Sequence, residues 1–349
     1  MTLSLSIRDV SHSYGDRLVL DSINLVVPRE SITAIIGPSG VGKTTLLRLI
    51  AGFEAPDKGS IEVEGELVAE NSRLIIPSQS RGVTVVPQDG ALFSHLTVGG
   101  NVAFGLKHRR SDATRARVNQ VLEIVGLSKY ERHRPSELSG GMQQRVALAR
   151  ALAPNPRVVL LDEPFAALDA GLREQVREET VRALRATKAT AIWVTHDQSE
   201  ALSTADQVAV MLGGRIQQVA APAILYQHPI SQQVAEFVGE TFVISGMSEV
   251  SGKYVKCALG DSVPIANECS AGPVKVVVRP EQLSIAQASD ESSVSVLVEG
   301  SKFFGHDGVV EGKFSTGERV VIRLQADQLP QAGSRVSVTT HGTLLAYND

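Results

Sequence analysis

The stretch Gly37-Pro38-Ser39-Gly40-Val41-Gly42-Lys43-Thr44 fits the pattern G-x-x-x-x-G-K-[ST], and Thr45 follows it directly. Glycines in such a loop let successive backbone N–H groups turn inward around phosphate oxygens, with no Cβ in the way. The lysine would reach the β- and γ-phosphates of ATP, and the hydroxyl of Thr44 would bind Mg²⁺. The alternative interpretation is a flexible turn rich in glycine. We expect residues 37–45 to form a nucleotide site.

The segments on either side of this loop favour the nucleotide interpretation. Residues 32–36 (ITAII) form a short apolar run that predicts a strand. After the loop, Leu46, Leu47 and Ile50 recur at helical spacing. A helix that begins here would direct the positive end of its dipole toward the phosphates. Strand, glycine-rich loop and helix in this order are the context that phosphate binding requires.

A second signal is VVLLDEP (158–164), an apolar strand that ends in two acidic residues. In a parallel sheet, the carboxyl end of this strand lies at the same edge as the phosphate loop. Asp162 could then hold Mg²⁺ through water, and Glu163 could act as the base toward an attacking water. By itself, an acidic pair after a strand is usually a solvated turn. The phosphate loop makes the catalytic interpretation the better one.

A third signal is Leu138-Ser139-Gly140-Gly141-Met142, which precedes a segment of helical character. Ser139 could simply cap the helix, with the two glycines in the preceding loop. The same pattern could also form a second anion-binding helix start that faces a γ-phosphate. The residues alone leave both interpretations open.

The order of these motifs resembles that of the ABC transporter ATPase family, in which the third motif reads LSGGQ. The family has further motifs at matching positions in this chain. The resemblance implies that a glutamine contacts Mg²⁺ and the attacking water, that a histidine contacts the γ-phosphate, and that an aromatic residue stacks on adenine. The matching residues are Gln88 (VPQDG) for the Q-loop, Asp169 (ALD) for the D-loop, His196 (VTHD) for the switch histidine and Tyr14 (SYG) for the adenine-stacking aromatic.

The resemblance also implies a homodimer. In the family, two ATPase domains face each other head to tail, and each ATP lies between one subunit's phosphate loop and the other's signature. Ser139, Gly140 and Gly141 would therefore act in trans. Catalysis would rest on Glu163, His196 and Gln88.

Three positions depart from the family pattern. Met142 stands where glutamine is usual and cannot make the same hydrogen bond to the facing nucleotide. Ala166 stands where serine is common, and Val41 replaces a usual serine or cysteine in a loop that works through its backbone. Because none of these residues belongs to the catalytic core, ATP hydrolysis is still expected.

Composition limits the other classes. The 349 residues are 43% hydrophobic and 21% charged, and the net charge of -4 lacks the basic excess of a nucleic-acid binder. Cys257 and Cys269 are the only cysteines, which suggests a reducing compartment. The N-terminus does not read as a signal peptide, and no apolar run approaches the ~18 residues of a membrane span. We expect a protein that is soluble by itself and reaches a membrane through a partner.

The pattern of elements predicts two domains. Alternating strands and helices up to about residue 235 predict an α/β P-loop ATPase domain over 1–235. By the family resemblance, this domain has a RecA-like core and a helical subdomain that carries the signature motif. Short Val-rich alternating segments punctuated by Gly and Pro follow, which predict an all-β, OB-like barrel domain with an accessory or regulatory role over 236–349.

The resemblance extends to importers. Residues 91–106 (ALFSHLTVGGNVAFGL) resemble the segment that docks a permease helix, although an amphipathic packing helix is the alternative. RPEQL (279–283) and FFGHDG (303–308) resemble the accessory barrel of importers for maltose, polyamines, sulfate and ferric iron. The ferric-iron group is the most similar, on QDGALF, on RPEQ and on Gly100 before Asn101.

This resemblance implies a peripheral subunit on the cytoplasmic face of the cell membrane. It would bind a permease near residues 88–106 and serve, indirectly, a periplasmic or extracellular solute-binding protein. Polyamine, sulfate or another small solute is the alternative cargo. Three other classes are an ABC ATPase outside transport, an ordinary P-loop kinase, and a regulatory module whose C-terminal domain binds a ligand or an inhibitory protein. A kinase would not need the signature motif or His196.

Overall fold

The computed structural model describes residues 2–107, 111–286 and 293–348. The chain forms two compact units, Met1–Ala223 and Ile224–Asp349. The division between them falls inside α7 (Pro222–Gln227), whereas the boundary expected between residues 235 and 236 falls inside α8 (Gln232–Val238). The sequence-based boundary therefore stays a prediction. Within the described ranges, no helix is both long enough and apolar enough to cross a membrane.

The first unit is built on a six-stranded sheet in the order β11-β10-β3-β9-β8-β7. All neighbouring strands are parallel except β11, which pairs antiparallel with β10. Five-residue apolar runs form the central strands because a parallel sheet is covered on both faces. The strands are β3 (Ile32–Ile36), β7 (Val83–Val86), β8 (Val158–Asp162), β9 (Ala191–Thr195), β10 (Gln207–Leu212) and β11 (Arg215–Ala220).

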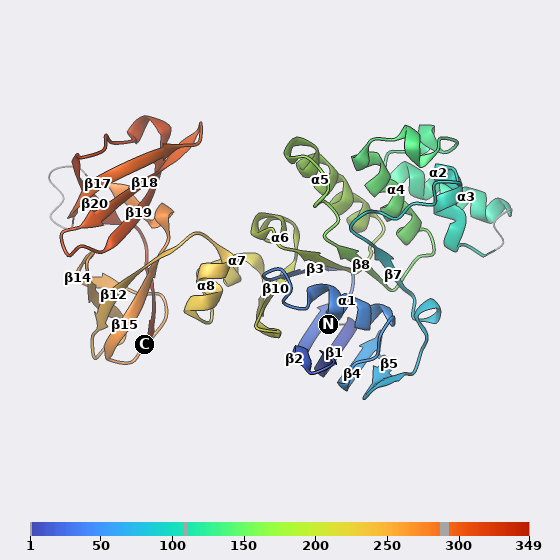
Figure 1. The fold of residues 1–349 in the computed structure, drawn as a ribbon, viewed down its shortest axis with the longest axis horizontal. Helices are drawn as coiled ribbons and strands as arrows, with labels where there is room; N and C mark the ends of the chain where they lie inside the picture. The colour runs from blue at the N-terminus through green and yellow to red at the C-terminus, as the bar shows by residue number, and fades with distance from the viewer. Residues whose placement is uncertain (1, 108–110, 287–292, 349) are drawn as a thin grey trace. The chain divides into compact units, whose positions relative to one another are not determined.

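Helices cover one face of this sheet (Figure 1). Ser139, Asp169 and Asp197 cap three of them by accepting hydrogen bonds from backbone N–H groups in the first turn. The helices of this unit, besides α1, are α2 (Val98–Val102), α3 (Asp112–Ile124), α4 (Gly140–Leu152), α5 (Ala170–Ala186) and α6 (Gln198–Thr204).

A second, antiparallel sheet lies on the other side, in the order β2-β1-β4-β5-β6. Helix α1 (Lys43–Ala51) follows the glycine-rich loop and packs against both sheets, as Figure 1 shows. The strands are β1 (Leu3–Tyr14), β2 (Arg17–Pro28), β4 (Lys58–Val63), β5 (Glu66–Glu70) and β6 (Arg73–Leu74).

Two hydrophobic cores lie on the two faces of the parallel sheet. Side chains of a strand alternate between its faces. Val158 and Leu160 therefore join the core that surrounds α1, whereas Val159 and Leu161 join the core beneath α2–α5. Trp193 on β9 is fully buried in the second of these cores. The apolar strand that ends at Asp162 is thus fixed from both sides.

Buried Arg81 secures the far end of the phosphate-loop helix. It is fully buried, and its guanidinium donates hydrogen bonds to the carbonyls of Leu49 (2.9 Å) and Ile50 (3.0 Å) at the end of α1. It also donates to the carbonyls of Val68 (3.1 Å) and Ile76 (2.8 Å). A cation at a helix C-terminus is favoured by the helix dipole. Arg81 therefore ties α1 to the antiparallel sheet.

The second unit is all-β apart from short helical segments, and it holds two five-stranded sheets around one core. The sheet orders are β14-β13-β12-β15-β21 and β16-β20-β17-β18-β19. Alternating valines such as Val296 and Val298 fill the shared core. The strands are β12 (Phe242–Ser248), β13 (Tyr254–Cys257), β14 (Gly260–Pro264), β15 (Gly272–Val278), β16 (Leu283–Ile285), β17 (Val294–Phe303), β18 (Asp307–Phe314), β19 (Arg319–Gln325), β20 (Arg335–Thr340) and β21 (Leu345–Asn348).

The expected architecture is confirmed: an α/β domain is followed by an all-β, barrel-like domain. The amphipathic helix considered for residues 91–106 is much shorter than that segment. Only α2 and one 3₁₀ turn, Ala103–Gly105, are helical there, and Thr97 caps α2. Gly99 and Gly100 disfavour a longer helix because glycine loses more backbone entropy than other residues.

Candidate functional site

The glycine-rich loop has a backbone that requires glycine at two places. A Cβ on Gly37 would lie 2.4 Å from the carbonyl oxygen of Met211, which is too close for any side chain. Gly42 has φ 109° and immediately precedes α1, and a Cβ there would lie 2.7 Å from the Leu20 side chain. Strands β2 and β10 thus press on the loop and fix its path. Close packing therefore requires glycine at these two positions of the predicted phosphate loop.

Lys43 begins α1 and is held inside the loop. Its side chain is almost completely buried, and Nζ donates to the carbonyl oxygens of Gly37 (2.7 Å) and Pro38 (3.0 Å). Burial lowers the pKa of Lys43, while the charges of Glu163 and Asp162 oppose that shift. The ammonium therefore lies at the loop itself, where an oxygen of a phosphate can replace a carbonyl as its partner.

A cavity of about 320 Å³ opens over the loop. It gathers residues from β1, β2, the loop, α1 and the end of β8. Most are residues that the sequence predicted for the nucleotide, but Arg17 and Val19 were not predicted. The only sequence signal for them is their place just after Tyr14 at the start of β2. The lining residues are Tyr14, Arg17, Val19, Ser39, Gly40, Gly42, Lys43, Thr44, Thr45 and Glu163.

Asp162 and Thr44 meet at the carboxyl edge of the parallel sheet. The Thr44 hydroxyl donates to Oδ1 of Asp162 at 3.2 Å. Burial raises the pKa of Asp162, and the nearby Glu163 charge adds to this, while Thr44 and Lys43 oppose it. A hydroxyl and a carboxylate are the hard oxygen donors that Mg²⁺ prefers. The two residues fit a magnesium ion that a nucleotide would bring.

Glu163 is held in an uncommon backbone conformation beside His196. Its φ is 43°, in the left-handed region, and its N–H donates to the carbonyl of Val194 at 3.0 Å. Oε2 of Glu163 lies 3.1 Å from Nδ1 of His196. Such strain is concentrated at functional sites. The structure thus brings together a carboxylate and an imidazole that lie far apart in the sequence, and of the two Glu163 also lines the cavity.

Gln88 lies just beyond the end of β7, and two α4 side chains fix its loop. Gln144 donates to the Gln88 carbonyl at 2.9 Å. Arg150 donates to the carbonyls of Gly90 (2.9 Å) and Ala91 (2.7 Å). The Gln88 side chain is not among those that line the 320 Å³ cavity. The contacts from α4 were not evident from the sequence because they join residues far apart in the chain.

The signature segment begins α4. The Ser139 side chain caps the helix by accepting from the N–H of Met142 at 3.4 Å. A Cβ on Gly141 would lie 2.8 Å from Val176, so glycine allows α4 to pack on α5. Met142 packs against the core beneath the helices. The capping interpretation of Ser139 is therefore observed, and its action on a second nucleotide stays a prediction.

The remaining predicted residues lie close to these elements. Asp169 caps α5 and accepts from the N–H of Leu172 at 3.0 Å. Val41 packs against the core that surrounds α1. Gly37, Pro38, Val41, Ser139, Gly140, Gly141, Asp169 and His196 are not among the residues that line the 320 Å³ cavity.

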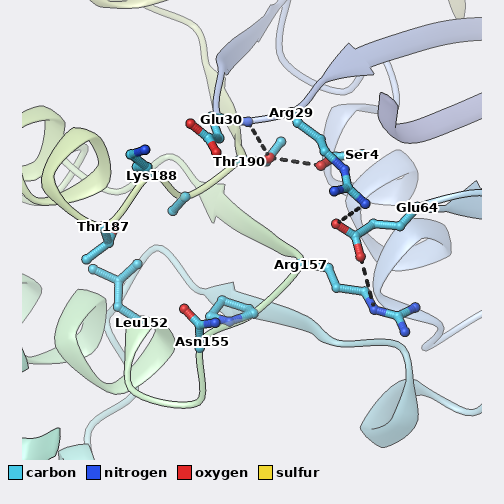
Figure 2. Close-up of a pocket in the computed structure, with 12 residues that line it drawn as sticks. Ser4, Arg29, Glu30, Glu64, Leu152, Asn155, Arg157, Thr187, Lys188 and Thr190 are labelled. Atoms are coloured by element: carbon cyan, nitrogen blue, oxygen red, sulfur yellow. Dashed lines mark hydrogen bonds and ion pairs between the residues drawn. The ribbon is translucent and has the colours of Figure 1, made fainter. Parts of the chain in front are cut away.

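A second cavity, of about 220 Å³, lies at the amino ends of the parallel strands, the edge opposite the phosphate loop (Figure 2). Three of the charged residues that line it form ion pairs with one another. Arg29 contacts Glu64 at 2.9 Å, and Arg157 contacts Glu64 at 3.5 Å and Glu66 at 2.6 Å, and Figure 2 shows the Arg29–Glu64–Arg157 chain. These carboxylates already satisfy the arginines. The phosphate-loop cavity is therefore the better candidate for the nucleotide.

Comparison with known proteins agrees with this assignment. Residues 20–166 match the family described as ABC transporter, and residues 276–343 match the TOBE domain. The chain is 44% identical to an Fe(3+) ions import ATP-binding protein of Rhodococcus jostii, over the whole length of both chains. It is 43% identical to the Fe(3+) ions import ATP-binding protein of Serratia marcescens, over 97% of each chain.

A solved structure is similar as well. The cbiO1 protein of Clostridium perfringens, part of the ABC transporter complex cbiONQ, superposes with a TM-score of 0.60 at 30% identity. The match covers 65% of this chain and 92% of that one. On the full-length identity and the matched domains, this chain belongs to the ABC transporter ATP-binding proteins.

Proposed function

We propose that this chain hydrolyses ATP to drive import of ferric iron through a membrane permease. The observation that carries the ATPase activity is the cavity that the phosphate loop lines together with Glu163, with Thr44 of that loop bonded to Asp162. The observation that favours iron is the full-length identity of 44% to proteins named for Fe(3+) import. Sulfate or a polyamine is the alternative solute.

The proposed reaction is attack of water on the γ-phosphorus. The loop N–H groups and Lys43 bind the phosphates, and Tyr14 stacks on adenine. Glu163 takes a proton from the water while the water oxygen forms a bond to the γ-phosphorus. At the same time, the bond between the γ-phosphorus and the β-phosphate oxygen breaks. His196, within hydrogen-bond distance of Glu163, contacts the γ-phosphate. Thr44, Asp162 and Gln88 would hold Mg²⁺, which neutralises phosphate charge when bound.

We also propose that two copies act together. Ser139, Gly140 and Gly141 begin a helix away from their own subunit's cavity, so a partner's nucleotide is the anion they would face. Asp169, which the sequence matched to the D-loop, immediately precedes α5 and caps that helix. ATP would close the pair, and hydrolysis would let it open.

Permease docking near residues 88–106 is supported by a groove of about 420 Å³. Gly100 and Ala103, which are small residues, line it, while the space beside Gly99 is taken by Glu131 of the same chain. The subunit would therefore lie on the cytoplasmic face of the membrane, with a periplasmic or extracellular solute-binding protein acting on the permease's other side.

Uptake of radioactive ferric iron tests this function in cells that carry the chain with its permease. Cells with Lys43→Ala should lose energy-dependent iron uptake, while sulfate and polyamine uptake stay unchanged. Loss of sulfate or polyamine uptake with normal iron uptake would transfer the assignment to the alternative solute.

A further inference from the structure

The Tyr14 ring lies at the end of β1, and its orientation is set by contacts on its hydroxyl. The residue is 48% exposed, so packing alone does not fix the ring. Its hydroxyl donates to Oε2 of Glu54 at 2.6 Å. Glu54 lies just after the end of α1, in the loop that leads to β4. A carboxylate distant in sequence thus holds an aromatic ring that lines the phosphate-loop cavity.

Glu54 is itself anchored by both of its oxygens. Arg48, in the last turn of α1, donates from Nε to Oε1 at 2.7 Å. Nε2 of His12 lies 3.3 Å from Oε2. The Glu54 side chain is only 21% exposed. The carboxylate therefore connects Tyr14 to the helix that begins at the phosphate loop.

His12 supports the same ring from its edge. The His12 and Tyr14 rings lie 5.0 Å apart at 88°, an edge-to-face arrangement. The other nitrogen of His12, Nδ1, lies 3.5 Å from Oδ1 of Asp57. Asp57 also accepts a hydrogen bond from the N–H of Ser13 at 2.7 Å. The contacts on the hydroxyl, chiefly with Glu54, and the edge contact of His12 on the ring define the plane of Tyr14.

The protonation states suit this arrangement. The hydrogen bond to Glu54, followed by burial, raises the pKa of Tyr14. Burial alone would raise the pKa of Glu54, but hydrogen bonds from Tyr14 and Arg48 outweigh it and lower that pKa. At neutral pH the phenol therefore donates to an ionised carboxylate, which is a stronger bond than one between neutral groups.

We propose that Glu54 is a positioning residue that fixes the ring plane of Tyr14 for stacking on a nucleotide base. It makes the cavity favour a triphosphate that carries a base over one that does not. An unanchored, exposed tyrosine would sample several rotamers, and only one of them presents its face to the base. This inference rests on the proposed function in taking the cavity as the ATP site.

The test compares binding of ATP with binding of inorganic tripolyphosphate, which has no base, by titration calorimetry in the presence of Mg²⁺. Stacking on an aromatic side chain contributes about 1–3 kcal/mol per base, and tenfold in affinity is about 1.4 kcal/mol. Glu54→Ala should therefore raise the Kd for ATP about fivefold or more and leave the Kd for tripolyphosphate unchanged. Tyr14→Phe, which keeps the ring and removes the bond, should behave in the same way.

Glu62→Gln is the matched control. Glu62 lies on β4 of the same sheet, is 24% exposed and pairs with Arg8 at 3.2 Å rather than with Tyr14. Its substitution should change neither Kd. Glu54→Gln, which retains an oxygen acceptor, should recover most of the ATP affinity lost in Glu54→Ala. The double variant Tyr14→Phe/Glu54→Ala should bind ATP no more weakly than either single variant, because both changes remove one interaction.

The outcomes separate this inference from the proposed function. If Tyr14→Ala weakens ATP binding but Glu54→Ala does not, Tyr14 stacks without positioning, and the inference is overturned alone. If Tyr14→Ala leaves the ATP Kd unchanged, the base does not stack there, and the base site of the proposed function is lost as well. Equal weakening of ATP and tripolyphosphate by Glu54→Ala would show a general effect on the loop and would also overturn the inference.

Discussion

Replacing Glu163 with glutamine changes one oxygen of the residue that is expected to accept the proton of the attacking water. The backbone stays in place because the Glu163 N–H is bonded to the Val194 carbonyl at 3.0 Å and the substitution is isosteric. A positioned general base contributes about 10²–10⁴ in rate. At 1.36 kcal/mol per tenfold, the barrier to hydrolysis should rise by about 3–5 kcal/mol.

ATP affinity should not fall in the same variant. Glu163 lines the cavity next to Lys43, whose charge it attracts, but among the described residues its side chain bonds to His196 rather than to the phosphate loop. Removing a negative charge beside the γ-phosphate removes a repulsion, so the Kd for ATP should stay the same or decrease. Phosphate release measures the rate of hydrolysis, and equilibrium binding of a fluorescent ATP analogue measures the Kd. Glu62→Gln is the control for loss of a carboxylate elsewhere in this domain.

Two results would refute this reasoning. A Glu163→Gln variant that releases phosphate within threefold of the wild-type rate would show that another group is the base. A variant that loses hydrolysis and ATP binding in equal measure would show that Glu163 acts in binding.

Two other substitutions test different contacts. Lys43→Ala should weaken ATP binding and abolish hydrolysis together, since the Lys43 ammonium contacts the loop carbonyls that phosphate oxygens would replace. A variant that binds ATP with wild-type affinity would contradict this role of Lys43. Asp206 accepts from Arg185 at 2.8 Å through each oxygen and from the Ile32 N–H at 2.7 Å. Although burial alone would raise its pKa, these bonds lower it. The stability that Asp206 provides is therefore present above its unfolded-state pKa and lost as pH falls through the lower folded-state pKa. In urea unfolding at pH 7, Asp206→Asn should lower the free energy of unfolding by about 1 kcal/mol or less, because the ion pair is partly exposed. This difference between variant and wild type should shrink below about pH 4. A difference that stays constant across that pH range would count against the ion pair.

The sequence predicted the strand before the glycine-rich loop and the strand that ends in acidic residues, because both signals are local. Residues 32–36 form an apolar run before the glycine-rich loop, and residues 158–162 form one that ends in Asp162. Each became a parallel strand at the expected place. The Val-rich segments after residue 246 likewise became strands of the second unit. For these elements, the side-chain pattern alone decides between strand and helix.

The parts that the sequence did not predict depend on distant residues. Arg17 and Val19 reach the cavity only because β2 turns back beside β1. Glu54 meets Tyr14, and Arg150 meets the loop after Gln88, across separations that leave no local pattern. Nothing in one chain's pattern shows what faces Ser139, because the surface that we propose to face it belongs to a second copy.

The most direct test of the central claim is ATPase activity measured over a range of protein concentrations for wild type and Ser139→Arg. Ser231→Arg, which alters the cap of α8 in the second unit, is the control. We predict that wild-type activity rises more steeply than protein concentration, that Ser139→Arg abolishes it, and that Ser231→Arg does not. Activity strictly proportional to concentration and unaffected by Ser139→Arg would show that each subunit hydrolyses ATP alone, and would contradict a site completed by a second copy.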